Sequence, residues 1–188
     1  MSAVLEVADL AVRFRTTRGT VNAVDGLSFA IGEGETVALV GESGSGKSTA
    51  ALALLRLIAD PPGRIAAGRI LFEGRDILAL REDELREVRG GRIAMIFQDP
   101  MMTLNPVYTI ERQIGEVLAL HAGMGREARA KEVVELLRLV GVPAPAERAK
   151  QYPHNLSGGM RQRVMVAMAL ACKPKLLITN AEKAEVAG

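Results

Sequence analysis

Aromatic residues are scarce in this chain. Phe, Tyr and Trp together make up 3% of the 188 residues, and Trp is absent. Hydrophobic residues still reach 48% of the sequence, so any core must be filled mainly by Ala, Val, Leu, Ile and Met. A chain of this length can bury the core of one domain and carry a small inserted lobe as well.

Cysteine is almost absent too. The single cysteine, Cys172, lies within the apolar run "VMVAMALAC". One cysteine cannot form a disulfide framework or a cysteine metal cluster. We therefore expect Cys172 to be a buried, inert thiol.

Long apolar runs and a large charge excess are also lacking. No stretch approaches 18 consecutive apolar residues, so we expect no transmembrane helix. The N-terminus has no basic leader before an apolar segment, so we expect no signal peptide. The 24 basic and 22 acidic residues give a net charge of +2, which does not favour a broad basic face for nucleic acid. We expect a soluble, cytoplasmic chain with no nucleic-acid partner, which meets a membrane only through other subunits.

Strand-like and helix-like segments alternate along the sequence. Such alternation predicts an α/β sheet core, and the almost purely helical stretch from about 99 to 155 predicts a lobe inserted into it. Expected strands lie within 1–35, at "TVALVG" (36–41), in a hairpin-like pair about Gly74 (68–78), at 92–97 and from Leu176; expected helices cover 47–59, 109–121, 126–140 and 156–172.

A glycine-rich segment, "GESGSGKST", follows the expected strand 36–41 and opens an expected helix. It fits the phosphate-loop pattern G-x-x-x-x-G-K-[ST] in the required context. Gly44 and Gly46 let backbone N–H groups turn toward phosphate oxygens, and Lys47 adds a positive charge. The Ser48 hydroxyl can ligate Mg²⁺. The predicted nucleotide site comprises Gly41, Glu42, Ser43, Gly44, Ser45, Gly46, Lys47, Ser48 and Thr49.

A second candidate anion site is "LSGGMRQR", residues 156–163. Ser157 is placed to cap a helix, while Gly158 and Gly159 permit a close backbone approach. One chain does not need two helix N-termini for one γ-phosphate. We therefore expect two subunits arranged head to tail, each presenting this segment to the other's phosphate loop.

Together with "IFQDPMMTLNP" (96–106) and "YPHNLSGGMRQRVMVAMALA", these motifs resemble those of ATP-binding-cassette (ABC) proteins, especially the ATP-binding subunits of bacterial dipeptide and oligopeptide importers. The resemblance covers residues 3–178. It implies a P-loop NTPase core (about 1–98 and 164–188) with an N-terminal antiparallel β portion, and a helical lobe (about 99–163) bearing the signature motif.

The resemblance also implies cofactors and partners. ATP and Mg²⁺ would bind between two cassettes, identical or paralogous, attached to transmembrane permease subunits. The chain would then lie at the cytoplasmic face of the bacterial inner membrane. The expected role is coupling of ATP binding and hydrolysis to uptake of peptides or similar solutes.

The resemblance also gives expectations for four further residues. Gln98 would sense Mg²⁺ or the attacking water and would touch the permease. Phe14 is the candidate to stack on adenine, with an ordinary core phenylalanine as the equal alternative. Neither His121 nor His154 fits the switch histidine, which follows the last expected strand in the family.

The resemblance breaks near the end of the chain. Where the family reads Ala-Asp-Glu-Pro-Thr, this chain reads "TNAEK", so that Asn180 replaces the Mg²⁺-ordering Asp and Ala181 replaces the catalytic Glu. A one-residue slip would align Glu182 with the Glu but leave Ala181 in place of the Asp. Because Asn is a poor ligand for Mg²⁺ and Ala cannot orient water, we expect negligible ATP hydrolysis.

Three functions follow from these observations. The first is an importer subunit, C-terminally truncated here and incomplete as a core, as in a disrupted gene; a naturally short protein is the alternative. The second is a hydrolysis-deficient nucleotide-binding module or an inert fragment. The third, a soluble ABC ATPase acting on DNA or ribosomes, is disfavoured by the balanced charge and the importer-like "QDPMMTLNP" loop.

Overall fold

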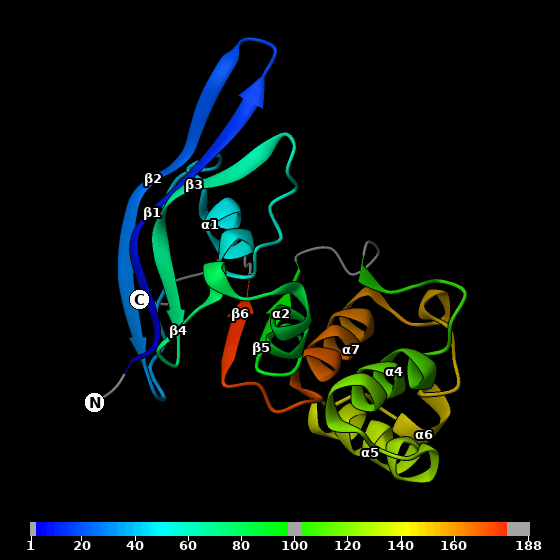
Figure 1. Ribbon diagram of the computed structural model, residues 1–188. Helices are drawn as coiled ribbons and strands as arrows, with labels where there is room; N and C mark the ends of the chain where they lie inside the picture. The colour runs from blue at the N-terminus through cyan, green and yellow to red at the C-terminus, as the bar shows by residue number, and fades with distance from the viewer. Residues whose placement is uncertain (1–2, 98–102, 180–188) are drawn as a thin grey trace, which may run out of the picture. The chain divides into compact units, whose positions relative to one another are not determined.

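The computed structural model describes residues 3–97 and 103–179 (Figure 1). Contacts group the chain into two compact units, Met1–Leu85 and Arg86–Gly188. Each unit is described by itself. The expected division at about 98 and 164, into a core and an inserted lobe, stays a prediction.

The first unit is built on an antiparallel sheet with the strand order β2-β1-β3-β4. A tight turn at Glu73–Gly74 joins β3 to β4, and Gly74 has the positive φ of 77° that such a turn requires. The predicted antiparallel portion and the hairpin about Gly74 are thus confirmed. The strands are β1 (Ala3–Thr16), β2 (Gly19–Gly32), β3 (Gly63–Phe72) and β4 (Arg75–Asp76).

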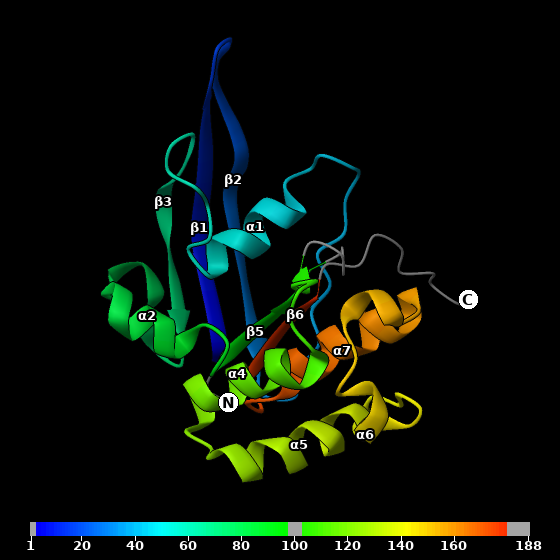
Figure 2. The same ribbon diagram turned by 90° about the vertical axis from the view of Figure 1, so that its right-hand side faces the viewer.

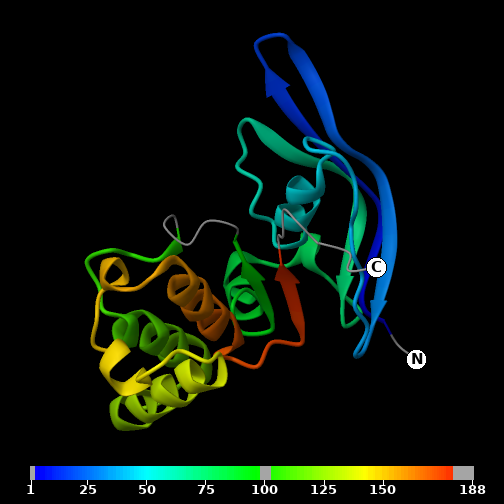
Figure 3. The ribbon, with the colours of Figure 1, turned by 180° about the vertical axis from the view of Figure 1, so that it is seen from behind.

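Helix α1 (Lys47–Leu54) packs on one face of this sheet (Figure 3). The helix buries small alanines such as Ala50 and Ala53, which allows a close approach to the strands. It ends earlier than the predicted residue 59, because Arg56 adopts a positive φ of 50°. The Arg56 guanidinium also donates a hydrogen bond to the Leu80 carbonyl at 2.7 Å, which fixes the chain where the helix stops.

The predicted buried strand at 36–41 is wrong. Residues 35–42 have no regular secondary structure, and Val40 is 88% exposed. A β-branched run becomes a strand only when neighbouring strands accept and donate its backbone hydrogen bonds. Strands β1 to β4 pair only with one another, so this run has no ladder partner in its own unit.

The second unit combines a two-stranded parallel sheet with a group of helices (Figure 2). β5 (Ile93–Ile96) pairs with β6 (Leu176–Thr179), although these strands lie far apart in sequence. Both strands and the three long helices were expected from the sequence; the short helices were not. The helices are α2 (Glu82–Val88, which crosses the unit boundary), α4 (Ile110–Ala122), α5 (Arg126–Leu139), α6 (Pro145–Arg148) and α7 (Gly158–Leu170), with the 3-10 turn η2 (Pro153–Asn155). The 3-10 turn η1 (Ile77–Ala79) belongs to the first unit.

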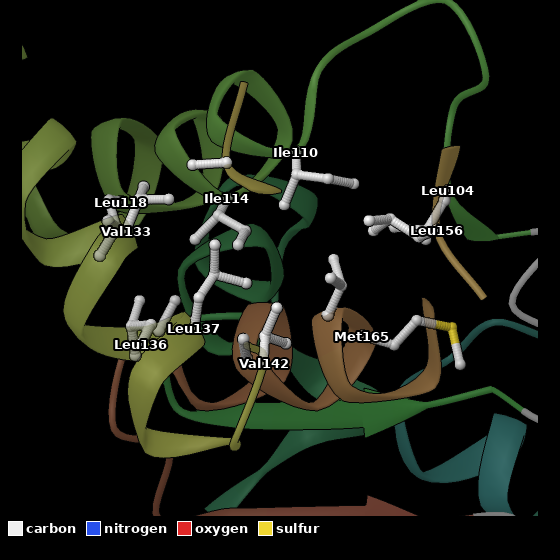
Figure 4. Close-up of a cluster of buried hydrophobic side chains, with 14 residues drawn as sticks. Leu104, Ile110, Ile114, Leu118, Val133, Leu136, Leu137, Val142, Leu156 and Met165 are labelled. Carbon is white, nitrogen blue, oxygen red and sulfur yellow. The ribbon is translucent and has the colours of Figure 1, made fainter. Parts of the chain in front are cut away.

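The helical core of this unit is formed by α4, α5 and α7 (Figure 4). Val133, Leu136 and Leu137 of α5 lie in it and Val140 packs against its edge, a spacing that puts these side chains on one face of the helix. Ile114 and Leu118 of α4 point into the same cluster.

Among residues 3–97 and 103–179, no helix is both long and apolar enough to cross a bilayer.

Candidate nucleotide-binding site

The glycine-rich loop adopts backbone angles that suit glycine. Gly44 has φ 81° and Gly46 has φ 90°, both in the left-handed region. Gly46 is also enclosed, because a Cβ atom there would lie 2.1 Å from the Ala23 carbonyl oxygen. Glycine is therefore required at position 46 for two reasons. The backbone there is left-handed, and the neighbouring strand leaves no room for a Cβ atom.

The Lys47 ammonium group folds back across this loop. Its Nζ donates hydrogen bonds of 2.7 Å to the carbonyls of Gly41 and Glu42 and one of 3.3 Å to the Ser45 hydroxyl. An ammonium group has three donors, so loop atoms engage all of them. These hydrogen bonds tie the Lys47 side chain back to Gly41, Glu42 and Ser45, and we call this closed arrangement the Lys47 ring.

Helix α1 begins directly after this ring. Gly46 is its N-cap and no side chain caps the helix, which leaves N–H groups of the first turn for an external acceptor. No acidic residue lies in that turn. Exposed Ser48 and part-buried Thr49 follow Lys47. The arrangement offers a positive, donor-rich helix N-terminus suited to a phosphate group.

The residues described here fit Mg²⁺ only in part. They contain no cluster of three or more His, Cys, Asp or Glu that could hold a metal ion by itself. The Ser48 hydroxyl can supply one oxygen ligand, and phosphate oxygens would have to supply others.

Phe14 lies in β1, where its ring packs over Gly63. A Cβ at Gly63 would lie 2.6 Å from the ring of Phe14 and 2.6 Å from Ile58. The side chain is half-buried. The ring therefore contributes to packing and keeps an exposed part, so both expectations for Phe14 stay predictions.

The second motif forms the N-terminus of α7. Ser157 is the N-cap, and its hydroxyl accepts a hydrogen bond from the Met160 N–H at 3.3 Å, so the predicted cap is confirmed. Ser157, Gly158 and Gly159 are all exposed, and a Cβ at either glycine would meet nothing within 4 Å. Among residues 3–97 and 103–179, no packing contact requires glycine at these two positions.

Two arginines that follow in α7 donate hydrogen bonds to backbone carbonyls of the second unit. The Arg161 guanidinium donates to the Pro153 carbonyl at 2.8 Å, and that of Arg163 donates to the Gly141 carbonyl. Arg161 therefore anchors the approach to α7, and Arg163 joins α7 to the segment after α5.

Several predicted residues lie outside the described chain. These are Gln98, which follows β5 in sequence, and Asn180, Ala181 and Glu182, which follow β6. Their expected roles, and the expected absence of a carboxylate pair, rest on the sequence alone.

The lone thiol and the histidines fit modest roles. Burial raises the pKa of the Cys172 thiol, whose Sγ lies 3.9 Å from the Val117 carbonyl oxygen, so the thiolate is disfavoured at neutral pH. His154 stacks on Tyr152 with ring centroids 5.6 Å apart. His121 packs against Gly90.

One residue with a structural role was missed. Gln113 is buried, and its amide binds the segment that precedes α4. The available signal was its position, because residue 113 lies on the same helix stripe as Ile110 and Ile114. A polar residue on an apolar stripe requires internal partners.

The sequence of this chain matches the profile of the ABC transporter family (ABC_tran) over residues 24–180. It is 54% identical over 176 residues to the oligopeptide transport ATP-binding protein OppD of Bacillus subtilis (strain 168), covering 94% of this chain and 49% of that protein. It is 50% identical over 180 residues to the dipeptide transport ATP-binding protein DppD of the same organism, covering 96% and 54%.

The fold is similar to a solved dimeric, post-hydrolysis structure of the ATP-binding cassette MJ0796 bound to ADP and Pi. The TM-score is 0.81 at 27% identity, covering 93% of this chain and 72% of that one.

This protein belongs to the ABC transporter family. The predicted fold class, a P-loop ATPase cassette with an antiparallel β portion and helices, is confirmed by the structural similarity. The chain spans about half the length of the curated relatives it matches.

Proposed function

We propose that this protein is the ATP-binding portion of an ABC importer subunit that serves the uptake of peptides or similar solutes. The observation that carries the proposal is the closed Lys47 ring at the N-terminus of α1, in a chain about half identical to oligopeptide and dipeptide transport ATP-binding proteins. Residues 41–49 bind the phosphates of ATP.

Lys47 changes partners when ATP binds. Its bond to the Ser45 hydroxyl is the longest of the three, at 3.3 Å, and a charge-assisted bond to a phosphate oxygen is stronger than one to a neutral hydroxyl. Nζ therefore keeps the carbonyls of Gly41 and Glu42 and exchanges Ser45 for phosphate. The Ser48 hydroxyl would help to hold Mg²⁺, which would neutralise negative charge on the phosphates.

The signature segment serves a second cassette. Glycine is among the less favourable residues in a helix, and none of the described residues lies within 4 Å of a Cβ placed at Gly158 or Gly159. This cost is understandable if an external backbone or phosphate must approach closely. The MJ0796 cassette in the similar structure is dimeric, which supports a partner cassette facing Ser157.

A groove in the second unit suits the transmembrane partner. It has a volume of about 490 Å³, lies between α4 and α5, and follows the Gln98 loop in sequence. Both signs of charge and an exposed leucine line it, as in Arg112, Glu116, Arg129 and Leu120. In this proposal a cytoplasmic segment of the permease occupies the groove, and the chain lies at the inner face of the membrane.

A second function is favoured by one observation. Asn180 and Ala181 stand where the family has its Asp and Glu, and neither residue replaces a carboxylate in hydrolysis. A module that binds ATP and forms a cassette dimer without turnover accounts for this substitution.

The test is ATP binding by the chain, measured by isothermal titration with ATP and Mg²⁺. Lys47→Ala should weaken binding about 10- to 100-fold, because it removes a charge-assisted hydrogen bond. Lys131→Ala is the matched control, since Lys131 is an exposed α5 lysine paired with Glu127, and it should bind ATP like the wild type. A folded chain that does not bind ATP, or that binds it equally well without Lys47, would refute the proposal.

A further inference from the structure

Exposed arginines gather toward the end of the β1–β2 hairpin, which projects beyond β3 in Figure 1. Arg13 and Arg15 lie in β1, Arg64 lies in β3, and Arg18 lies in the turn between β1 and β2. No acidic residue occurs in the sequence segments 10–24 and 61–72. The positive charge of these segments is therefore not balanced within them.

The strand register places Arg13 directly opposite Arg64. Arg13 of β1 pairs with Arg64 of β3 on one side and with Asn22 of β2 on the other. The Cβ atoms of such opposed residues are about 4.5–5.5 Å apart, and like charges there destabilise a sheet. Arg15 lies on the same face, about 7 Å further along β1. We call this surface the arginine face, and its residues are Arg13, Arg15, Thr20, Asn22 and Arg64.

The arginine face is the side of the sheet that faces away from α1. Val12 is fully buried, and the ring of Phe14 packs over Gly63. Because successive side chains of a strand point to opposite faces, Arg13 points to solvent between these two packed neighbours. The three arginines of the face are all exposed.

No carboxylate offsets the repulsion between the opposed arginines. In the part of the chain that the structure describes, no ion pair engages the side chain of Arg13, Arg15 or Arg64. Two other arginines of the first unit do find acidic partners, since Arg75 pairs with Glu84 and Arg81 pairs with Asp83. An external anion would supply the missing charge at the arginine face.

The backbone holds these charges at a fixed spacing. The Arg15 N–H donates a hydrogen bond to the Pro62 carbonyl at 2.9 Å, which joins β1 to the segment before β3. The Thr16 hydroxyl donates to the Gly19 carbonyl at 2.8 Å and accepts from the Arg18 N–H at 3.3 Å, which closes the turn. The arginines are thus presented by a braced sheet.

The spacing of the arginine face fits an extended acidic peptide. A strand with a carboxylate at every second residue repeats its charge about every 7 Å, as Arg13 and Arg15 do, and a guanidinium can bind a carboxylate through two parallel hydrogen bonds. Binding to a membrane surface gains strength from buried apolar side chains, and binding to single-stranded nucleic acid gains it from aromatic stacking. The residues of the arginine face include neither kind.

We propose that the arginine face is a docking surface for an extended acidic segment of a partner protein. Carboxylates at alternate residues of that segment pair with Arg13, Arg15 and Arg64, and they relieve the repulsion between Arg13 and Arg64. Because the surface lies across the sheet from α1, docking needs neither ATP nor the proposed transport function.

The test measures binding of a fluorescent peptide of about eight residues, alternating Glu and Thr to span the face, by anisotropy at low salt. The protein is the 188-residue chain. Added salt should weaken binding, since it screens exposed charges. Arg13→Thr/Arg64→Thr should weaken it about four- to 25-fold, because each exposed ion pair contributes about two- to fivefold. Arg126→Thr is the matched control, since it removes an exposed arginine of α5, and it should bind like the wild type.

Arg64→Glu tests the register directly. Opposite charges would then face each other across β1 and β3, so the midpoint of urea unfolding should rise. Peptide binding should fall at least as far as in Arg64→Thr, which carries the binding test if the glutamate variant does not fold. A lowered midpoint would show that Arg64 stabilises the sheet, and it would overturn the proposal.

Two further peptides test the spacing and the charge. One has the same composition with its glutamates in a block, and the other has Gln in place of Glu; both should bind more weakly than the alternating peptide. Equal binding of the block and alternating peptides, or binding that Arg13→Thr/Arg64→Thr leaves unchanged, overturns the proposal. Phosphatidylserine vesicles or a thymidine oligonucleotide that bind more tightly than the peptide, and lose binding in the same double variant, would assign the face to lipid or nucleic acid instead.

Discussion

Gly44 and Gly46 differ at the level of single residues, although they belong to one loop. Both have positive φ angles, yet a Cβ at Gly44 would meet nothing within 4 Å, while one at Gly46 would strike the Ala23 carbonyl. The sequence motif specifies both glycines equally. The structure distinguishes a glycine needed for its conformation from one needed also for space.

The matched substitutions Gly44→Ala and Gly46→Ala should therefore differ in stability. A left-handed alanine costs about 1–2 kcal/mol at either position, and the clash at Gly46 adds about 1–3 kcal/mol. Urea unfolding should show the larger loss for Gly46→Ala. Equal losses at the two sites would contradict the close approach to Ala23.

At the scale of elements, α5 shows how spacing selects a buried face. Leu137 is fully buried, whereas Leu139, two residues on, is 71% exposed. Residues two apart on a helix point in different directions. The residue type alone does not distinguish the buried position from the exposed one.

Leu137→Ala should lower the free energy of unfolding by about 2–5 kcal/mol, as is usual for a leucine in a packed core. Leu139→Ala should change it by less than about 0.5 kcal/mol. Thermal or urea denaturation of the two variants decides the point. A comparable loss at Leu139 would mean that this face is covered in solution.

The elements also show what the sequence could specify. Helices α4, α5 and α7 and strands β5 and β6 were predicted because their periodicity, caps and breakers agree locally. The strand predicted at 36–41 was wrong. Its residues do favour a strand locally, but a strand forms only with pairing partners, which a local pattern does not contain. The buried hydrogen bonds of Gln113 were missed for a similar reason, since its partners are backbone atoms of an irregular segment.

At the scale of the whole molecule, the proposed ATP-binding elements lie among the described residues, whereas the residues that the family uses for turnover are judged from the sequence alone. The phosphate loop and the capped signature helix are formed. The positions that would supply the carboxylates read Asn180 and Ala181.

We therefore predict that this 188-residue chain hydrolyses ATP negligibly, measured as phosphate release under saturating ATP and Mg²⁺. The double variant Asn180→Asp/Ala181→Glu is the informative comparison, since it restores the family's two carboxylates without altering the binding loop. Turnover comparable to that of an intact relative, and abolished by Lys47→Ala, would disprove the prediction.

The hydrogen bonds of Lys47 to the phosphate loop preorganise that loop for nucleotide binding. Because its ammonium already bridges Gly41 and Glu42, the loop is ordered before any nucleotide arrives, and little conformational entropy remains to be lost on binding. Removing the lysine therefore changes the starting state as well as the complex. The calorimetric signature of Lys47→Ala should combine a smaller binding enthalpy with a more unfavourable entropy, since ATP would then have to order a loop that the native chain orders for itself.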